Sequence, residues 1–203
     1  MNLFIPSRLR WADKGLALTQ TTAFPASGDV TFTLDSVDTA RPLTLMLRYP
    51  EWSGRPTVRV NGRKVGVRQS PSSYIALRRK WRPGDKVEVS YPMHLALEQT
   101  PDNPARAALL YGPVVLAGDL GTEGMTAPAP FSDPTVRNDY YTYDYHIPAG
   151  LPTHISVDPK NPAGALERTG ALEFRTPGGV TVRPLFDTHR TRYVVYWDID
   201  SPQ

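Results

Sequence analysis

The sequence contains no cysteine. This absence excludes disulfide bonds, and it excludes metal sites built on thiolate ligands. Histidine could supply metal ligands instead, but no two histidines have the spacing of two or four residues that places both rings on one face of a strand or helix. The four are His94, His146, His154 and His189. The sequence therefore predicts no metal site and no bound cofactor in this chain.

Long hydrophobic runs are also missing. No stretch approaches the length of apolar residues that a membrane span needs. The first residues, 1–6, lack the basic region and apolar core of an export signal, so any such signal would lie outside this chain. We therefore expect no membrane partner, and the cellular location stays open.

The basic residues, which give a formal net charge of +3, are scattered as single residues and pairs through strand-like segments. This arrangement is typical of solvated strand faces. The densest cluster, 78–82, could hold an anionic partner, but we favour the interpretation of a solvated turn. We expect no nucleic-acid partner.

Recognised catalytic motifs are absent as well. The sequence has neither the G-x-S-x-G turn of serine hydrolases nor a phosphate-binding P-loop. Hydrolysis of a glycosidic bond needs two carboxylates about 5 to 10 Å apart, for which Asp35 with Asp38, or Glu51, are the nearest candidates. All three fall at strand ends and are interpreted as turn residues. The mixed cluster 187–192 is interpreted as surface ion pairs, so no catalytic residue is predicted.

What the chain does have is 21 prolines and 15 glycines, which favour many short elements joined by turns over long helices. Strict alternation of apolar and polar residues predicts half-buried strands at 30–34 and 43–49. Asn61-Gly62 is the strongest hairpin signal, because both residues accept the positive φ angles of a type I′ turn. Further strands follow at spacings of about eight to twelve residues. These patterns predict an all-β fold: an antiparallel, jelly-roll-like β-sandwich followed by a second, smaller β unit.

The longest apolar run, residues 107–118, is predicted to form buried strands that bend at Gly112-Pro113. Strands are dense before this run, whereas a long stretch without hydrophobic period, 119–150, follows it. We therefore place a domain boundary at its end. The prediction is a β-sandwich over residues 1–118 and a long loop with a smaller C-terminal β unit over residues 119–203.

Aromatic side chains are the remaining candidates for a binding site, because an aromatic ring can stack on a sugar. The residues proposed for carbohydrate contact are Trp52, Trp81, Tyr140, Tyr141 and Tyr143. Trp11 belongs to the same group of tryptophans that could form a platform. The alternative, which we favour, is that the tryptophans pack between sheets and that the tyrosines pin a loop onto the sandwich.

Six short strings carry a family resemblance. They lie at residues 2–7, 18–25, 47–52, 60–62, 81–85 and 110–118, and they include Tyr-Pro-Glu-Trp, Trp-Arg-Pro-Gly-Asp and Tyr-Gly-Pro-Val-Val-Leu-Ala-Gly. In this order they resemble the C-terminal β region of glycoside hydrolase family 127, the family of β-L-arabinofuranosidases. The tail, with strings at 182–187 and 192–197, resembles the smaller C-terminal domain of longer members.

The resemblance implies that catalysis takes place elsewhere. In that family the reaction runs in an (α/α)6 barrel, where a cysteine nucleophile lies among zinc-binding cysteines and a glutamate, and none of those residues has a counterpart here. The resemblance thus implies a non-catalytic β portion, inactive alone, whose partner is the barrel of the same parent protein, and it suggests a chain that starts just after the active site.

Two other functions stay open at this point: a carbohydrate-binding module for arabinose-containing glycans and, third, a complete small enzyme. We also expect weak dimerisation through the segments 2–5 or 140–145, which a missing barrel would leave exposed.

Overall fold

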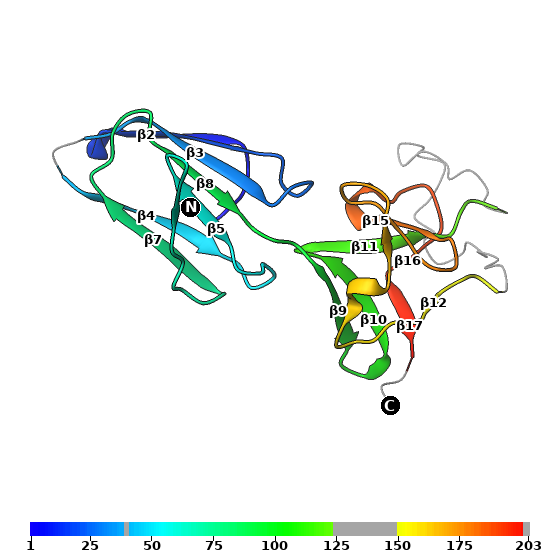
Figure 1. Ribbon diagram of the computed structural model, residues 1–203. Helices are drawn as coiled ribbons and strands as arrows, with labels where there is room; N and C mark the ends of the chain where they lie inside the picture. The colour runs from blue at the N-terminus through cyan, green and yellow to red at the C-terminus, as the bar shows by residue number, and fades with distance from the viewer. Residues whose placement is uncertain (39–40, 124–149, 201–203) are drawn as a thin grey trace.

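The computed structural model describes residues 1–38, 41–123 and 150–200, and its elements are nearly all strands (Figure 1). The strands form two separate units that are joined by one short connection. Within the described ranges, the strand pairs are antiparallel except for β12 with β17. This architecture confirms the predicted all-β fold, with a sandwich followed by a second β unit.

The first unit is a sandwich of a wide sheet and a narrow one. The wide sheet has the order β1-β2-β3-β8-β5-β6, and the narrow sheet consists of β4 and β7 alone. Their bounds are β1 Ser7–Trp11, β2 Leu16–Thr22, β3 Asp29–Ser36, β4 Leu43–Tyr49, β5 Thr57–Val60, β6 Arg63–Val65, β7 Ser73–Arg79 and β8 Lys86–Ser90. A short 3-10 helix, η1 Ala12–Lys14, links β1 to β2.

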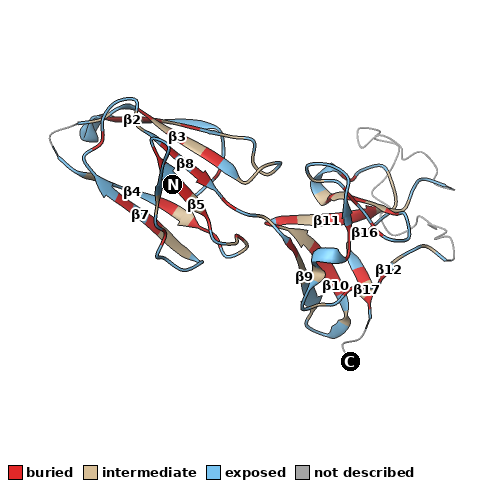
Figure 2. Cartoon of the chain, in the orientation of Figure 1, coloured by how far each residue is buried: buried red, intermediate tan, exposed pale blue. Residues whose placement is uncertain are grey.

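The core of the first unit lies between these two sheets because apolar residues alternate along the strands. On β3, Val30, Phe32 and Leu34 are at most 1% exposed, while the residues between them face outward. Red bands alternate with tan or pale blue bands along the strands in the same way (Figure 2). The alternation read from the sequence therefore fixes which face of each strand is buried.

The hairpin at Asn61-Gly62 is confirmed. It joins β5 to β6, with φ angles of 50° and 75° at these two residues, and the register pairs Val58 with Val65. The side chain of Asn61 also donates to the Asp85 carboxylate at 2.8 Å, and its Oδ1 accepts from the N–H of Lys86 at 2.8 Å. The turn is thus tied to the neighbouring strand β8.

Replacing Gly62 by valine is expected to destabilise the first unit by about 1 to 2 kcal/mol, because a β-branched residue resists a positive φ. No atom lies within 4 Å of an added Cβ, so the effect is one of backbone strain alone. Urea denaturation of the two proteins measures the difference. An unchanged midpoint would contradict the expectation.

The second unit is built on one nine-stranded sheet. Its main path runs β12-β17-β10-β11-β15-β14-β13, with β9 paired to β10 and β16 paired to β11. The bounds are β9 Leu95–Thr100, β10 Asn103–Tyr111, β11 Val114–Asp119, β12 His154–Ile155, β13 Glu167–Arg168, β14 Phe174–Arg175, β15 Thr181–Pro184, β16 Tyr193–Val194 and β17 Tyr196–Ile199. Two 3-10 helices, η2 Pro162–Gly164 and η3 Leu185–Asp187, complete it.

The structure divides the chain at a different place from the predicted boundary at residue 118. One core ends at Tyr91 and the other begins at Leu95. The apolar run 107–118 forms β10 and β11 in the middle of the second sheet. A long apolar run indicates a strand that is covered on both faces, and such strands lie at the centre of a unit rather than at its border.

The N-terminal segment is held against the sandwich without being a strand. Residues 2–5 do not form a strand, and the first strand begins after Pro6. Instead, the side-chain amide of Gln20 donates to the carbonyls of Leu3 and Ile5, both at 2.8 Å, and Phe4 is buried in the core. The Gln20 side chain thereby satisfies two backbone carbonyls that a neighbouring strand would otherwise bind.

Candidate functional site

Trp81 is a poor candidate for a sugar platform, because its side chain is completely buried. The indole Nε1 donates to the carbonyl of Leu43 at 2.9 Å, and the Arg79 guanidinium lies over the ring at 5.2 Å. A ring enclosed in this way offers no face to a ligand. Its place in the sandwich core agrees with the alternative of buried packing that the sequence left open.

Trp52 is half-buried in an aromatic cluster at the end of the sandwich. Its ring stacks on Phe24 at 5.9 Å and meets Phe4 and Tyr91 edge-on at 6.4 and 6.2 Å. Burial raises the pKa of Tyr91, whose hydroxyl donates to the carbonyl of Arg48 at 2.7 Å. The cluster therefore closes the core, and only part of the Trp52 ring reaches solvent.

The three remaining candidates, Tyr140, Tyr141 and Tyr143, lie outside the described residues. Trp11, in contrast, is well exposed, at 47%. It lies on β1, with the Lys14 ammonium 5.8 Å from the centre of its ring. The structure thus does not bring the tryptophans together on one surface.

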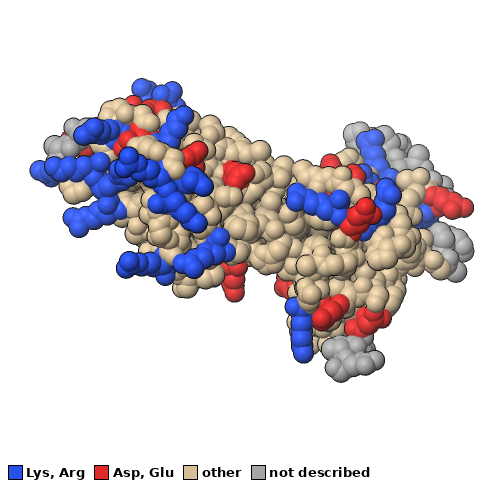
Figure 3. All heavy atoms as spheres, in the orientation of Figure 1, with Lys and Arg blue, Asp and Glu red and all other residues tan. Residues whose placement is uncertain are grey.

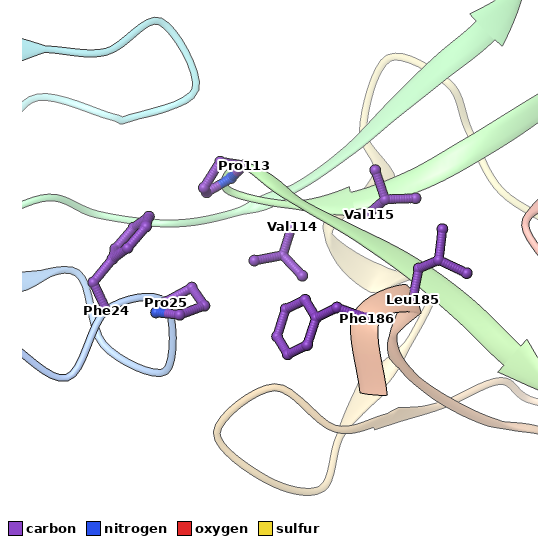
Figure 4. A pocket seen from close by; sticks show the side chains of 7 residues that line it. All are labelled: Phe24, Pro25, Pro113, Val114, Val115, Leu185 and Phe186. Atoms are coloured by element: carbon purple, nitrogen blue, oxygen red, sulfur yellow. The ribbon is translucent and has the colours of Figure 1, made fainter. Parts of the chain in front are cut away.

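An apolar groove between the two units was not found from the sequence. Phe24 and Pro25 line it from the first unit, and Leu185 and Phe186 line it from η3. Residues 113–115 at the start of β11 form its floor (Figure 4). The groove measures about 510 Å³, and none of its lining side chains is polar. It can hold apolar groups, but it offers no side-chain hydrogen-bonding group to the hydroxyls of a sugar.

The best-connected polar cluster centres on Asp119 at the end of β11. Its carboxylate accepts from the Thr191 hydroxyl at 2.5 Å, from the N–H of Gly121 at 2.9 Å and from the Arg183 guanidinium. Burial alone would raise the pKa of Asp119, but these hydrogen bonds and the charge of Arg183 lower it below its ordinary value. The cluster ties β11 to β15 and to the segment before β16.

Stability of the second unit should therefore depend on pH. Because folding depresses the pKa of Asp119, its contribution to stability is present above the pKa of the unfolded chain, which is about 4. It is lost as pH falls from there through the lower, folded pKa. We expect an Asp119→Asn variant to unfold at lower temperature than the parent at pH 7, and the gap to narrow towards pH 3. A gap that stays constant across this range would contradict the expectation.

Other charged groups form exposed pairs rather than a reaction centre. Asp35 accepts from the Thr19 hydroxyl at 2.7 Å and pairs with Arg8 at 3.3 Å, and the Glu51 carboxylate accepts from Ser72 at 3.2 Å. Within the part of the chain that the structure describes, no three His, Asp or Glu side chains are grouped as metal ligands would be. None of the described helices has the length and apolar character of a membrane-spanning one.

The charge is divided unequally between the units. Residues 1–93 carry 15 Lys and Arg against 7 Asp and Glu, so the first unit is basic and the remainder of the chain is acidic. Cations gather over the first unit on the face shown in Figure 3. This difference in charge between the units could not be predicted from the net charge of the whole chain with a boundary at residue 118.

Comparison with known proteins follows the division between the cores. The family model described as beta-L-arabinofuranosidase, GH127 middle domain, matches residues 1–93. No curated protein sequence matches the chain.

Three solved structures share the fold at low sequence identity. One is described as a glycoside hydrolase, with a TM-score of 0.64, 19% identity, and coverage of 96% of this chain and 34% of that one. Another is a GH127 beta-L-arabinofuranosidase from Geobacillus stearothermophilus T6, with a TM-score of 0.63, 20% identity, and coverage of 98% and 33%. A third, a GH127 beta-arabinofuranosidase, has a TM-score of 0.56, 20% identity, and coverage of 96% and 33%. The chain thus spans about one third of the length of these proteins.

Proposed function

Residues 1–93 belong to the GH127 middle-domain family, and from this premise we propose that the chain is the non-catalytic β portion of a glycoside hydrolase that resembles β-L-arabinofuranosidases. Its role is to support a catalytic (α/α)6 barrel that acts on arabinosides. The observation that carries this proposal is the coverage: nearly the whole chain matches only a third of each solved GH127 enzyme.

The chemistry of the chain supports a structural role. Each unit has its own core, and two of the carboxylates that the sequence offered for hydrolysis, Asp35 and Glu51, accept hydrogen bonds from hydroxyl groups at the surface. The residues of this chain do not fit the zinc ion of the family's barrel. Cysteine is absent, and no three of the described histidine, aspartate and glutamate side chains lie together as zinc ligands would. We therefore assign neither a catalytic step nor a zinc site to this chain.

The purified chain should hydrolyse no nitrophenyl β-L-arabinofuranoside, with or without added zinc. Mixing it with a barrel polypeptide from a GH127 enzyme of the same organism should raise the solubility and melting temperature of that polypeptide. Turnover that follows the chain through purification would refute the non-catalytic role. A barrel polypeptide unaffected by the chain would refute the supporting role.

Binding of arabinose-containing glycans is the second candidate, and the exposed ring of Trp11 is the observation that favours it. Affinity electrophoresis of the chain in gels containing arabinan tests it directly. Retardation that disappears in a Trp11→Ala variant would support a carbohydrate-binding module. Unretarded migration of the parent chain would refute glycan binding and would not affect the proposed supporting role.

A further inference from the structure

One strand of the first unit presents an apolar face that no other strand covers. Leu9 and Trp11 on β1 pair with Leu18 and Leu16 on β2, so all four side chains point to the inner face of the wide sheet. The two residues on β2 are 1% and 6% exposed, whereas Leu9 is 39% and Trp11 47% exposed. The narrow sheet of β4 and β7 covers β2 and leaves the inner face of β1 open.

Two further exposed apolar side chains lie on the segment just before β1. Leu3 is 68% and Ile5 56% exposed, on the segment that Gln20 holds against the sheet next to the start of β1. Ser7 lies opposite Gln20 in the register, two residues before Leu9 on the same face. We call these four side chains, Leu3, Ile5, Leu9 and Trp11, the β1 patch. Contiguous exposed apolar patches of a few hundred Å² on a monomer are often interaction sites.

The backbone around the patch is also open to a partner. β1 is the first strand in the sheet order, so among the described residues only its β2 side is paired. At the edge of the narrow sheet, the Met1 amine donates to the carbonyl of Met46 at 2.6 Å, and Met1 accepts from the N–H of Arg48 at 3.0 Å. These two bonds follow the pattern of a parallel strand beside β4, so this edge of the narrow sheet is already engaged by the chain itself.

One cation beside the patch and the charge of the whole first unit indicate the charge of its partner. The Lys14 ammonium lies 5.8 Å from the centre of the Trp11 ring. Arg8 and Arg10 alternate with the apolar residues along β1 and therefore belong to the opposite face of the sheet. The first unit as a whole has about twice as many basic as acidic side chains. A complementary surface therefore has apolar side chains at its centre and carboxylates at its rim.

We propose that the β1 patch is the docking surface for the catalytic barrel of the GH127 enzyme, and this inference rests on the proposed function. The solved relatives indicate this occupant, because two thirds of their length lies beyond the part that this chain matches. The barrel covers Leu9 and Trp11 with apolar side chains and brings a carboxylate to Lys14 beside the Trp11 ring. We propose no docking site at the interunit groove, since nothing in the structure indicates which partner would fill it.

The test uses the full chain and, as probe, the catalytic barrel of a GH127 β-L-arabinofuranosidase of the same organism, produced as a separate polypeptide. A double variant, Leu9→Thr with Trp11→Thr, removes the centre of the patch and keeps residues that favour strands. The matched control is Tyr196→Thr, which removes a ring of 58% exposure from β17 in the second unit. Isothermal titration calorimetry gives the affinity of each protein for the barrel.

The double variant should bind the barrel at least about tenfold more weakly than the parent, and the control should bind like the parent. A parent chain that binds while the double variant binds equally well would overturn the docking surface and leave the proposed function standing. A parent chain that does not bind would overturn both. A dimer of the chain alone that the double variant abolishes, with barrel binding unchanged, would assign the patch to a second copy instead.

Folding of the variants is checked by their melting curves. If the double variant does not fold, Leu3→Ser with Ile5→Ser removes the most exposed half of the patch without touching β1. The same tenfold loss is expected of it, and unchanged affinity would again overturn the docking surface.

Discussion

A Gly28→Ala variant is expected to lose about 3 kcal/mol or more of the stability of the first unit. An ideal Cβ at Gly28 would lie 2.0 Å from the carbonyl oxygen of Tyr91 and 3.0 Å from its carbonyl carbon. Both atoms belong to the backbone, so no side-chain rotation can relieve the overlap. The N–H of Tyr91 also donates to the carbonyl of Gly28 at 3.0 Å, and separating the two segments would break this bond.

The matched control for this prediction is Gly66→Ala. No atom lies within 4 Å of a Cβ at Gly66, and its φ lies outside the left-handed region. Alanine there should be neutral or stabilising by about 0.5 kcal/mol, because it restricts the unfolded chain. Urea midpoints of the two variants and the parent decide the matter. Equal midpoints for Gly28→Ala and Gly66→Ala would mean that the contact between Gly28 and Tyr91 is not formed.

The second large effect is expected of Trp81→Ala, at about 3 to 5 kcal/mol. The substitution empties the space of a completely buried indole and leaves the carbonyl of Leu43 without its donor. It also removes the ring on which the Arg79 guanidinium lies. The two contacts that are lost hold Trp81 to β4 and β7, the strands of the narrow sheet.

Trp11→Ala supplies the comparison for Trp81→Ala. Trp11 is 47% exposed and keeps only a contact with Lys14 on its open face, so we expect a loss of about 1 kcal/mol or less. Thermal melts followed by circular dichroism give the loss of stability for both variants, in which the same substitution is made at two positions. If the two variants melted together, the assignment of one tryptophan to the core and the other to the surface would be refuted.

The candidate site residues show what the local sequence pattern can and cannot predict. Trp11, Trp52 and Trp81 occur in similar strand-end contexts, and their sequence neighbourhoods do not tell them apart. Their different burial comes from strands that are distant in the chain: Trp81 meets Leu43, and Trp52 meets Phe4 and Tyr91. The cluster at Asp119 has the same origin, since Arg183 and Thr191 are 64 and 72 positions away.

Local periodicity and turn chemistry determined the strands and hairpins, because alternation at 30–34 and the positive φ angles at Asn61-Gly62 depend on neighbouring residues alone. Composition likewise determined that no disulfide or thiolate site can form. Only the tertiary structure decided that the cores divide between Tyr91 and Leu95, that β4 and β7 leave the face of β1 open, and that the first unit carries the positive charge. These features depend on which distant strands pair and on how far one sheet covers another, and the period of a single strand carries no information about its partners.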